Sequence, residues 1–369
     1  MRFATRKTST MRAALLLVAL LVALLWAPNI FADSVETHER TVTKIAEGIY
    51  VIRHPDAPDT FPQGNTTVVV GEREVLVVDS CLLPSAARED IAQIRQWTTK
   101  PVRYLVNTHW HFDHNNGNGD YSAAFPGLSI VAQVETRNMI ESFNPAAVST
   151  YAARRERFQQ YLTTGKDGDG KPVSDALRKD LIRSMNGIDA VVAEFKNVHV
   201  TVPNVVFDHE LSVDLGNRVA RIMFLGRGNT AGDTVVFLPK ERIVVAGDLL
   251  DHPVPYFFGG FPAELSQTLR NLARLDPQLV IPGHGEVLRD QVYLNMVIDL
   301  TEQVVAVVRR EVGNMPRRTL EEVQQAVAKS VDVAAWRLKF AGDDKDNRDN
   351  FDESFDSLIK TAYKEALVR

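Results

Sequence analysis

Short stretches near the start of the chain alternate between apolar and polar residues, a pattern typical of β-strands that bury one face. Gly71-Glu72-Arg73 separates two of these stretches and predicts a tight hairpin turn. A second set of short, turn-bounded stretches follows residue 199 with a similar spacing. The predicted strands are 41–46, 49–53, 66–70, 74–78, 102–106, 202–207, 210–213, 219–224, 234–238, 242–245 and 279–281.

Apolar residues spaced three or four positions apart predict helices between and after these strands. Such spacing covers about 84–97, where Pro84 suits the first helical position, and about 263–275. Residues 133–198 are charged and helical in pattern, which predicts a helical insertion. Strands that come first in hairpins and then alternate with helices predict a mixed α/β sandwich.

Two apolar stripes at helical spacing run along the tail, residues 288–369, and predict a helical C-terminal extension. The charged stretch 343–349 between them predicts a loop, without the glycine that a calcium-binding EF-hand needs. We interpret the stripes as core packing, and a homodimer contact is a second interpretation. Their residues are Val297, Leu300, Val304, Val308, Phe351, Phe355, Leu358 and Leu367.

Composition changes this picture in two ways. An apolar fraction of 45% and a charged fraction of 24% indicate an ordinary globular protein, and a net charge of −5 argues against nucleic acid as a partner. The single cysteine, Cys81, excludes an internal disulfide and a structural zinc site built from cysteines.

The N-terminus has the pattern of a secretory signal. Four basic residues within the first twelve precede an apolar run from Ala13 to Trp26, and small residues follow up to Ala32. We therefore predict a signal peptide at 1–32 and a periplasmic or secreted protein. The apolar run is 14 residues long, whereas a bilayer span needs about 20. No stable membrane span is expected after cleavage, and an uncleaved N-terminal anchor is the alternative.

Three histidines and one aspartate lie within six residues, directly after the predicted buried strand 102–106: His109, His111, Asp113 and His114. Imidazole suits zinc, copper, nickel and iron, and a neighbouring carboxylate can bind the same ion or a second one. In extended chain, residues two apart point the same way, so His109 and His111 can hold one ion together. Asp113 and His114 can then face a second ion.

Four further motifs lie at the ends of predicted strands. The loop 226–233 contains glycines that do not fit the dinucleotide-binding spacing. Each motif alone is weak evidence, but the joint placement of the three that lie downstream of the histidine cluster predicts a metal site. The motifs are Asp79, the loop 226–233 with Asn229, Asp248 in Ala246-Gly247-Asp248, and His284 in Pro282-Gly283-His284-Gly285.

With these motifs in this order, the chain resembles the metallo-β-lactamase superfamily over about 41–287. The resemblance implies a four-layer αββα sandwich, with 133–198 as an insertion. It also implies a glyoxalase II-like ligand set, because Cys81 does not match the subclass with a metal-binding cysteine. In that set His109, His111 and a third ligand hold the first metal, Asp113, His114 and His284 hold the second, Asp248 bridges both, and Asp79 orients the histidine loop.

Asn229 departs from the family pattern, which usually has histidine at this point. An amide oxygen is a weaker zinc ligand than imidazole. Three interpretations follow: Asn229 ligates directly or through a water, the first site is weak and leaves a mononuclear enzyme, or the centre is degenerate and inactive. His54, His209 and His252 are weaker candidates for the missing ligand.

Together with the predicted signal peptide, the resemblance implies a secreted hydrolase that uses a zinc-activated hydroxide on a small-molecule carbonyl substrate, namely a β-lactam, lactone, ester or thioester. We expect two zinc ions per chain, or one because of Asn229. Asp113 would act catalytically by orienting the nucleophile and relaying its proton. The alternatives are an impaired metal-binding accessory protein and a mononuclear-iron, sulfur-dioxygenase-like oxidoreductase. The Tyr256-Phe257-Phe258 trio would line an apolar substrate pocket or pack in the core.

Overall fold

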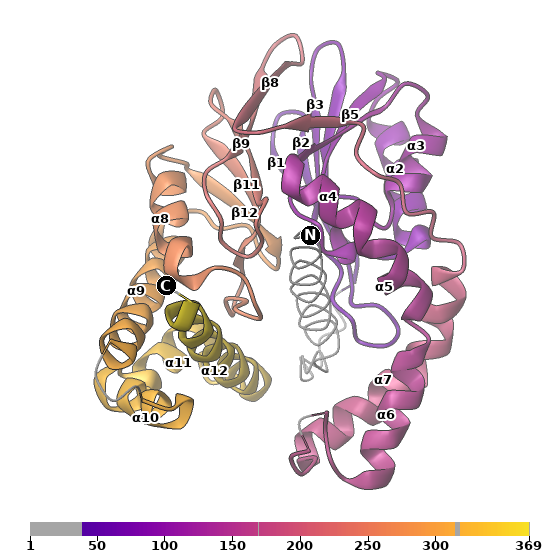
Figure 1. Cartoon of the computed structure of the whole chain (residues 1–369). Coiled ribbons are helices and arrows are strands. Elements are labelled where there is room, and N and C mark those ends of the chain that lie inside the picture. The colour runs from indigo at the N-terminus through magenta and orange to yellow at the C-terminus, as the bar shows by residue number, and fades with distance from the viewer. Residues whose placement is uncertain (1–38, 169, 314–317, 369) are drawn as a thin grey trace, which may run out of the picture.

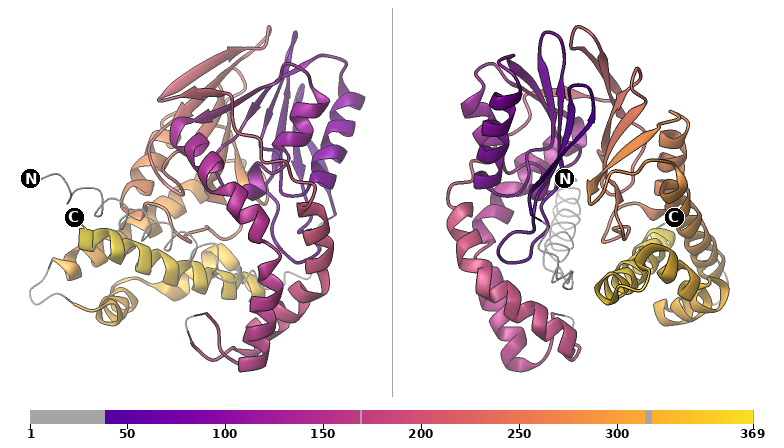
Figure 2. Two further views of the ribbon diagram at one scale, coloured as in Figure 1. Left: turned by 45° about the vertical axis from the view of Figure 1, so that its right-hand side comes forward. Right: turned by 180° about the vertical axis from the view of Figure 1, so that it is seen from behind.

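The structure is a computed structural model that describes residues 39–168, 170–313 and 318–368. The predicted signal peptide, 1–32, lies outside the described residues. Two β-sheets pack face to face, and helices cover the outer face of each, so that the layers run α, β, β, α (Figure 1). The right-hand view of Figure 2 shows this order of layers, which is the predicted four-layer sandwich.

The N-terminal sheet begins as an antiparallel meander and continues with parallel strands. The turn at 71–73 joins the third and fourth strands, as predicted. The strand order is the order in the sequence. The strands are β1 (Thr41–Ala46), β2 (Ile49–Arg53), β3 (Thr66–Val70), β4 (Val75–Val78), β5 (Val102–Val106), β6 (Ser129–Gln133) and β7 (Val205–Phe207).

The C-terminal sheet has the order β12-β11-β10-β9-β8 and is antiparallel except for its β11–β12 pair. Two of its strands extend beyond their predicted ends, because β11 and β12 stay paired, with register shifts, past residues 245 and 281. Asp248 and His284 therefore lie within strands and not after them. The strands are β8 (Glu210–Asp214), β9 (Val219–Phe224), β10 (Thr234–Leu238), β11 (Ile243–Asp251) and β12 (Leu279–His284).

Successive residues of the central strands face two different cores. In β3, Val68 packs outward beneath the helices and Val69 packs inward against the other sheet. Since side chains alternate across a strand, a strand between two layers is apolar on both faces, and all four residues of β4 are buried. The inner core joins residues of both sheets, including Leu76 and Ile222.

Helices α2 and α3 cover the N-terminal sheet, while α4 to α7 form the insertion. Helix α2 matches its predicted bounds. The pair α6–α7 extends away from the sheets as an arm (Figure 1), held together by a small apolar cluster of its own around Phe158 and Leu181. These helices are α2 (Pro84–Trp97), the 3-10 turn η1 (Phe112–His114), α3 (Asn118–Ala124), α4 (Val134–Ser142), α5 (Asn144–Thr150), α6 (Ala153–Thr164) and α7 (Asp175–Phe195).

Helix α8 and the helices of the tail share one core with the outer face of the C-terminal sheet. The first apolar stripe of the tail is buried, as predicted, and so is the second except for Leu367, which is exposed near the chain end. These helices are α8 (Pro262–Ala273), α9 (Val292–Val312), α10 (Leu320–Ser330), α11 (Val333–Ala341) and α12 (Lys345–Val368). Within the described ranges, no helix is both long enough and apolar enough to cross a bilayer.

The prediction of a loop at 343–349 is wrong, because α12 begins at Lys345. Local polar contacts support this start. The carboxylate of Asp344 accepts a hydrogen bond from the backbone N–H of Asn347, and Lys345 pairs with Asp349 one turn later. An N-terminal carboxylate and an i,i+4 ion pair favour a helix in a charged sequence.

Candidate metal centre

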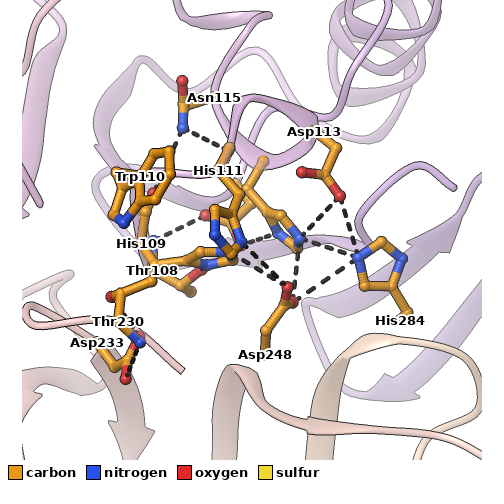
Figure 3. Close-up of polar contacts among 12 residues, drawn as sticks. Thr108, His109, Trp110, His111, Asp113, Asn115, Thr230, Asp233, Asp248 and His284 are labelled. Carbon is orange, nitrogen blue, oxygen red and sulfur yellow. Dashed lines mark hydrogen bonds and ion pairs between the residues drawn. The ribbon is translucent and has the colours of Figure 1, made fainter. Parts of the chain in front are cut away.

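The site lies where the ends of several strands from both sheets meet. Asp79 follows β4, and the histidine loop follows its parallel neighbour β5, so both leave the sheet at the same edge. Asp248 and His284 come from the parallel pair β11–β12 of the other sheet. Figure 3 shows the Asp248 side chain between the histidines of the loop and His284.

The first donor group consists of His109, His111 and Asp248. Nε2 of His109 lies 3.0 Å from Nδ1 of His111 and 3.2 Å from Oδ2 of Asp248. The distance from His111 Nδ1 to Asp248 Oδ2 is 4.0 Å. Tetrahedral ligands with bonds of about 2.1 Å lie roughly 3.4 Å apart. The group therefore has the dimensions of one face of a zinc coordination sphere.

The second donor group consists of Asp113, His114 and His284. The two Nε2 atoms of its histidines are 3.1 Å apart, and Oδ2 of Asp113 lies 3.6 Å from His114 Nε2 and 3.3 Å from His284 Nε2. Oδ1 of Asp248 lies 3.1 Å from His114 Nε2. One oxygen of Asp248 thus faces each donor group, which is the arrangement of a bridging carboxylate.

Three observations indicate that these two groups suit a divalent cation. Oδ1 of Asp248 is buried and has no hydrogen-bond partner among the described residues. The backbone approaches the donors so closely that a Cβ on Gly283 would overlap this oxygen, and a Cβ on Gly64 would overlap the imidazole of His114. The donors are imidazole nitrogens and carboxylate oxygens, which suit zinc.

Asp79 determines which nitrogen two of the histidines present to the site. Its Oδ2 lies 2.9 Å from Nδ1 of His114 and accepts a hydrogen bond from the Thr108 hydroxyl at 2.7 Å. Because that hydroxyl donates to Asp79, it accepts from Nδ1 of His109, 3.0 Å away. Both Nδ1 atoms then carry the proton, and both Nε2 lone pairs face the donor groups, as in metal sites whose outer carboxylates fix the tautomer. Asp79 itself has a positive φ of 60°, which aspartate tolerates better than most residues.

Two asparagines, which the sequence analysis did not single out, hold the histidine loop from behind. The amide of Asn115 donates to the carbonyl oxygen of His111 at 2.6 Å, and the amide of Asn144 donates to that of Trp110 at 3.0 Å. Asn144 also donates to the Asn115 side chain at 2.8 Å. Adjacency to His114 was a signal for Asn115, but nothing in the sequence places Asn144, at the start of α5, beside this loop.

The electrostatics of the donors follow from burial and mutual charge. Burial opposes ionisation of Asp248, but the imidazoles of His114, His109 and His284 outweigh it and hold the pKa of Asp248 well below its usual range. Burial likewise opposes the charged form of His284, but Asp248 and Asp113 raise the pKa of His284 to about 9. Burial dominates at His109 and lowers its pKa. The carboxylate of Asp248 is therefore ionised, and in the metal-free protein His284 carries a compensating proton that a cation would displace.

Two histidines of the centre are partly exposed to solvent. The side chains of His111 and His284 are 19% and 21% exposed, whereas that of His114 is fully buried. The Trp110 ring lies 4.5 Å from the His111 ring, and the Tyr256 ring lies 6.4 Å from it. These aromatic rings flank the accessible side of the centre. Of the predicted aromatic trio, Phe257 packs in the core instead.

Asn229 lies in the loop between β9 and β10, next to Thr230, whose backbone N–H and hydroxyl donate to buried Asp233. Its side chain is half-buried, and its amide nitrogen is buried without a hydrogen-bond partner among the described residues. The alternative histidines do not belong to the two donor groups. His54 pairs with Asp90 elsewhere, His209 is exposed, and the ring of His252 packs against Tyr293.

Two sheets face to face, with two cation-sized donor groups at their shared edge, define the class of metallo-β-lactamase-like folds. The family model for the metallo-beta-lactamase superfamily matches residues 59–284. The chain belongs to this superfamily of metal-dependent hydrolases.

Individual relatives are distant. A metallo-beta-lactamase type 2 of Elizabethkingia meningoseptica is 27% identical over 103 residues, which cover 26% of this chain and 41% of that protein. A metallo-beta-lactamase from Pontibacter korlensis aligns with 72% of this chain and 99% of its own at 18% identity and a TM-score of 0.52. The metallo-beta-lactamase DIM-1, in a crystal exposed to ceftazidime, aligns with 72% of this chain and 98% of its own at 19% identity and a TM-score of 0.50. These likenesses show the fold.

Proposed function

We propose that this protein is a secreted zinc-dependent hydrolase that cleaves a small carbonyl substrate, namely an ester, thioester, lactone or β-lactam. The observation that supports it most is Asp248, whose two oxygens face two separate donor groups at 3.1–3.2 Å. Zinc, when bound in such a site, polarises a carbonyl and lowers the pKa of a water ligand towards about 7. His109, His111 and Asp248 would hold one ion, with Asn229 as a further ligand. Asp113, His114, Asp248 and His284 would hold the other.

In this proposal, Asp113 transfers the protons of the reaction. Its Oδ2 lies 3.3 Å from His284 Nε2, and its side chain is 10% exposed, so it sits at the edge of the centre and not behind it. We assign it to orient the attacking water, accept its proton and pass that proton to the leaving group. Asp79 keeps His109 and His114 in the tautomers that binding requires.

The aromatic rings suggest the shape of the substrate. Trp110 packs at 5.0 Å against Phe143 in the insertion, and Tyr256 packs at 5.0 Å against Phe258. These two pairs of rings flank His111 and present apolar surface beside the carbonyl-binding position. We propose that they bind an apolar group of the substrate, because pockets for small molecules are lined largely by such side chains.

A variant with one donor removed tests the proposal. We expect the His111→Ala variant to lose at least about 100-fold in kcat/KM toward a chromogenic ester or β-lactam, because the first donor group loses a ligand. The matched control is His209→Ala, which truncates an exposed histidine between β7 and β8 that belongs to neither donor group. Zinc-loaded His111→Ala that turns over as fast as wild type would exclude the assignment.

Elemental analysis of the purified protein separates the alternatives. Two zinc ions per chain support the dinuclear hydrolase, and one ion supports the mononuclear form that follows from Asn229. One iron supports a dioxygenase-like oxidoreductase, and a substoichiometric metal content supports an accessory role.

We also propose the division into a signal peptide, 1–32, a hydrolase domain, 41–287, and a C-terminal extension, 288–369.

A further inference from the structure

A third carboxylate of β11 lies beside the centre, and neither the motifs nor the proposed ligand set uses it. Asp251 is the last residue of β11, three residues after Asp248, and pairs in register with His284 on β12. One donor atom each of Asp248, Asp251 and His284 lie within 4.8 Å of one another. Two ligands on opposite sides of one ion are separated by about 4.2 Å, twice a bond of about 2.1 Å. Small side-chain movements therefore suffice for Asp251 to reach an ion held by His284.

The Asp251 carboxylate is buried, and no described protein atom stabilises its charge by a hydrogen bond. The residue is 6% exposed, and both carboxylate oxygens are buried with no hydrogen-bond partner among the described residues. A buried carboxylate in this state is costly, and buried charges in proteins are paired or coordinate metals. The buried carboxylate of Asp59 differs in this respect. Asp59, which is fully buried, accepts from the Tyr151 hydroxyl at 2.6 Å and from the backbone of Phe61.

The position of Asp251 is fixed by contacts of its backbone and not of its side chain. Its carbonyl oxygen accepts a hydrogen bond from the Tyr293 hydroxyl, and the next N–H, of His252, donates to the carbonyl oxygen of His284 at 3.2 Å. These bonds keep the end of β11 against the end of β12. The side chain faces the second donor group, and its carboxylate makes no hydrogen bond to the described residues.

We propose that Asp251 is a further ligand of the metal held by the second donor group. This inference rests on the proposed function. It gives that ion three carboxylates, from Asp113, Asp248 and Asp251, and two imidazoles, from His114 and His284. The first donor group has only one carboxylate and lacks the usual third histidine. The two positions then differ in charge and in ligand number, and the second is the stronger site.

The test uses Zn²⁺ as the probe and the full mature protein. In a His111→Ala background, which disables the first donor group, chelator competition measures binding at the second group alone. Adding Asp251→Asn should weaken Zn²⁺ binding at least about tenfold, since even outer partners of metal ligands contribute about 10–100-fold. Thermal unfolding of the metal-free protein should not be lowered, because the replacement removes only an unpartnered carboxylate. The rise in melting temperature on adding Zn²⁺ should shrink.

Asp59→Asn in the same background is the matched control, a buried aspartate that does have partners. We expect it to lower the metal-free melting temperature and leave Zn²⁺ affinity unchanged. If Asp251→Asn binds Zn²⁺ as tightly as its parent, or only destabilises the metal-free protein, the role of Asp251 is excluded and the proposed function stands. If the wild type binds no Zn²⁺ at all, both fail together.

Discussion

At the scale of single residues, the proposed ligand Asn229 would complete the first donor group. His109 and His111 supply two nitrogens and Asp248 one oxygen, so a tetrahedral ion has one position left. The unpartnered amide nitrogen of Asn229 is informative, because the two ends of an amide are assigned from the hydrogen-bond network and can be exchanged. The exchanged amide would place an oxygen lone pair at that buried point.

This geometry predicts the effect of restoring the family residue. We expect Asn229→His to raise zinc affinity at the first donor group by at least about tenfold, because imidazole binds zinc more strongly than a neutral amide oxygen. Isothermal titration with Zn²⁺ measures it, and Asn229→Ala is the control, expected to bind no tighter than wild type. Equal affinity in Asn229→His and wild type would show that residue 229 lies away from the ion.

At the scale of elements, the parallel pair β11–β12 positions half of the centre. The register between these strands shifts at Gly247 and again before Asp251. These shifts bring Asp248 and Asp251 to the same side as His284, which a regular ladder with alternating side chains would not do for residues three apart. The close approach of the strands requires glycine at 283, where a Cβ would overlap the Asp248 carboxylate.

We therefore expect Gly283→Ala to displace Asp248 and weaken zinc binding at least about tenfold, with a loss of about 1–3 kcal/mol in unfolding free energy from overpacking. Zinc titration and thermal unfolding measure the two effects. Gly313→Ala is the control, since a Cβ at this end of α9 would lie 3.2 Å from the nearest atom, the Arg309 carbonyl oxygen. Comparable losses in both variants would argue against a specific close approach at Gly283.

At the scale of the whole molecule, the charge of the centre couples folding to pH and to metal. In the metal-free protein Asp248 and Asp113 hold the pKa of His284 at about 9 against the effect of burial, above 6.5 in the unfolded chain. A raised histidine pKa stabilises the fold fully below about pH 6.5 and loses this contribution as pH rises through about 9. Metal binding requires neutral imidazoles, so its contribution grows as pH rises.

The metal-free and zinc-bound forms should therefore differ in their response to pH. We expect metal-free protein to lose about 1–3 kcal/mol of unfolding free energy between about pH 6.5 and about pH 9. Zinc at 100 times the dissociation constant of pH 6.5 should add about 2.7 kcal/mol at that pH, and the same zinc concentration should add more at the higher pH. Thermal unfolding with chelator and with zinc at both pH values measures this. Metal-free protein that becomes more stable across this interval would contradict it.

Much of the fold could be predicted from local sequence. The bounds of α2 and of several strands follow from periodicity and turn residues, because these depend on neighbours along the chain. The start of α12 could not be predicted well, since a charged stretch forms either a loop or a helix depending on contacts such as Lys345 with Asp349. The extra length of β11 and β12 depends on pairing between segments 36 residues apart in register, Ile243 with Leu279.

The sequence by itself determined the alternation of strands and helices and singled out the members of the two donor groups, because side-chain chemistry and local periodicity can be read from the order of residues. Only the tertiary structure decided that the two oxygens of Asp248 face different donor groups, that Asp79 orients two histidines, and that Asp251 lies beside His284. These relations join strands from opposite sheets. They depend on how the sheets pack and shift in register, which spacing along one chain does not encode.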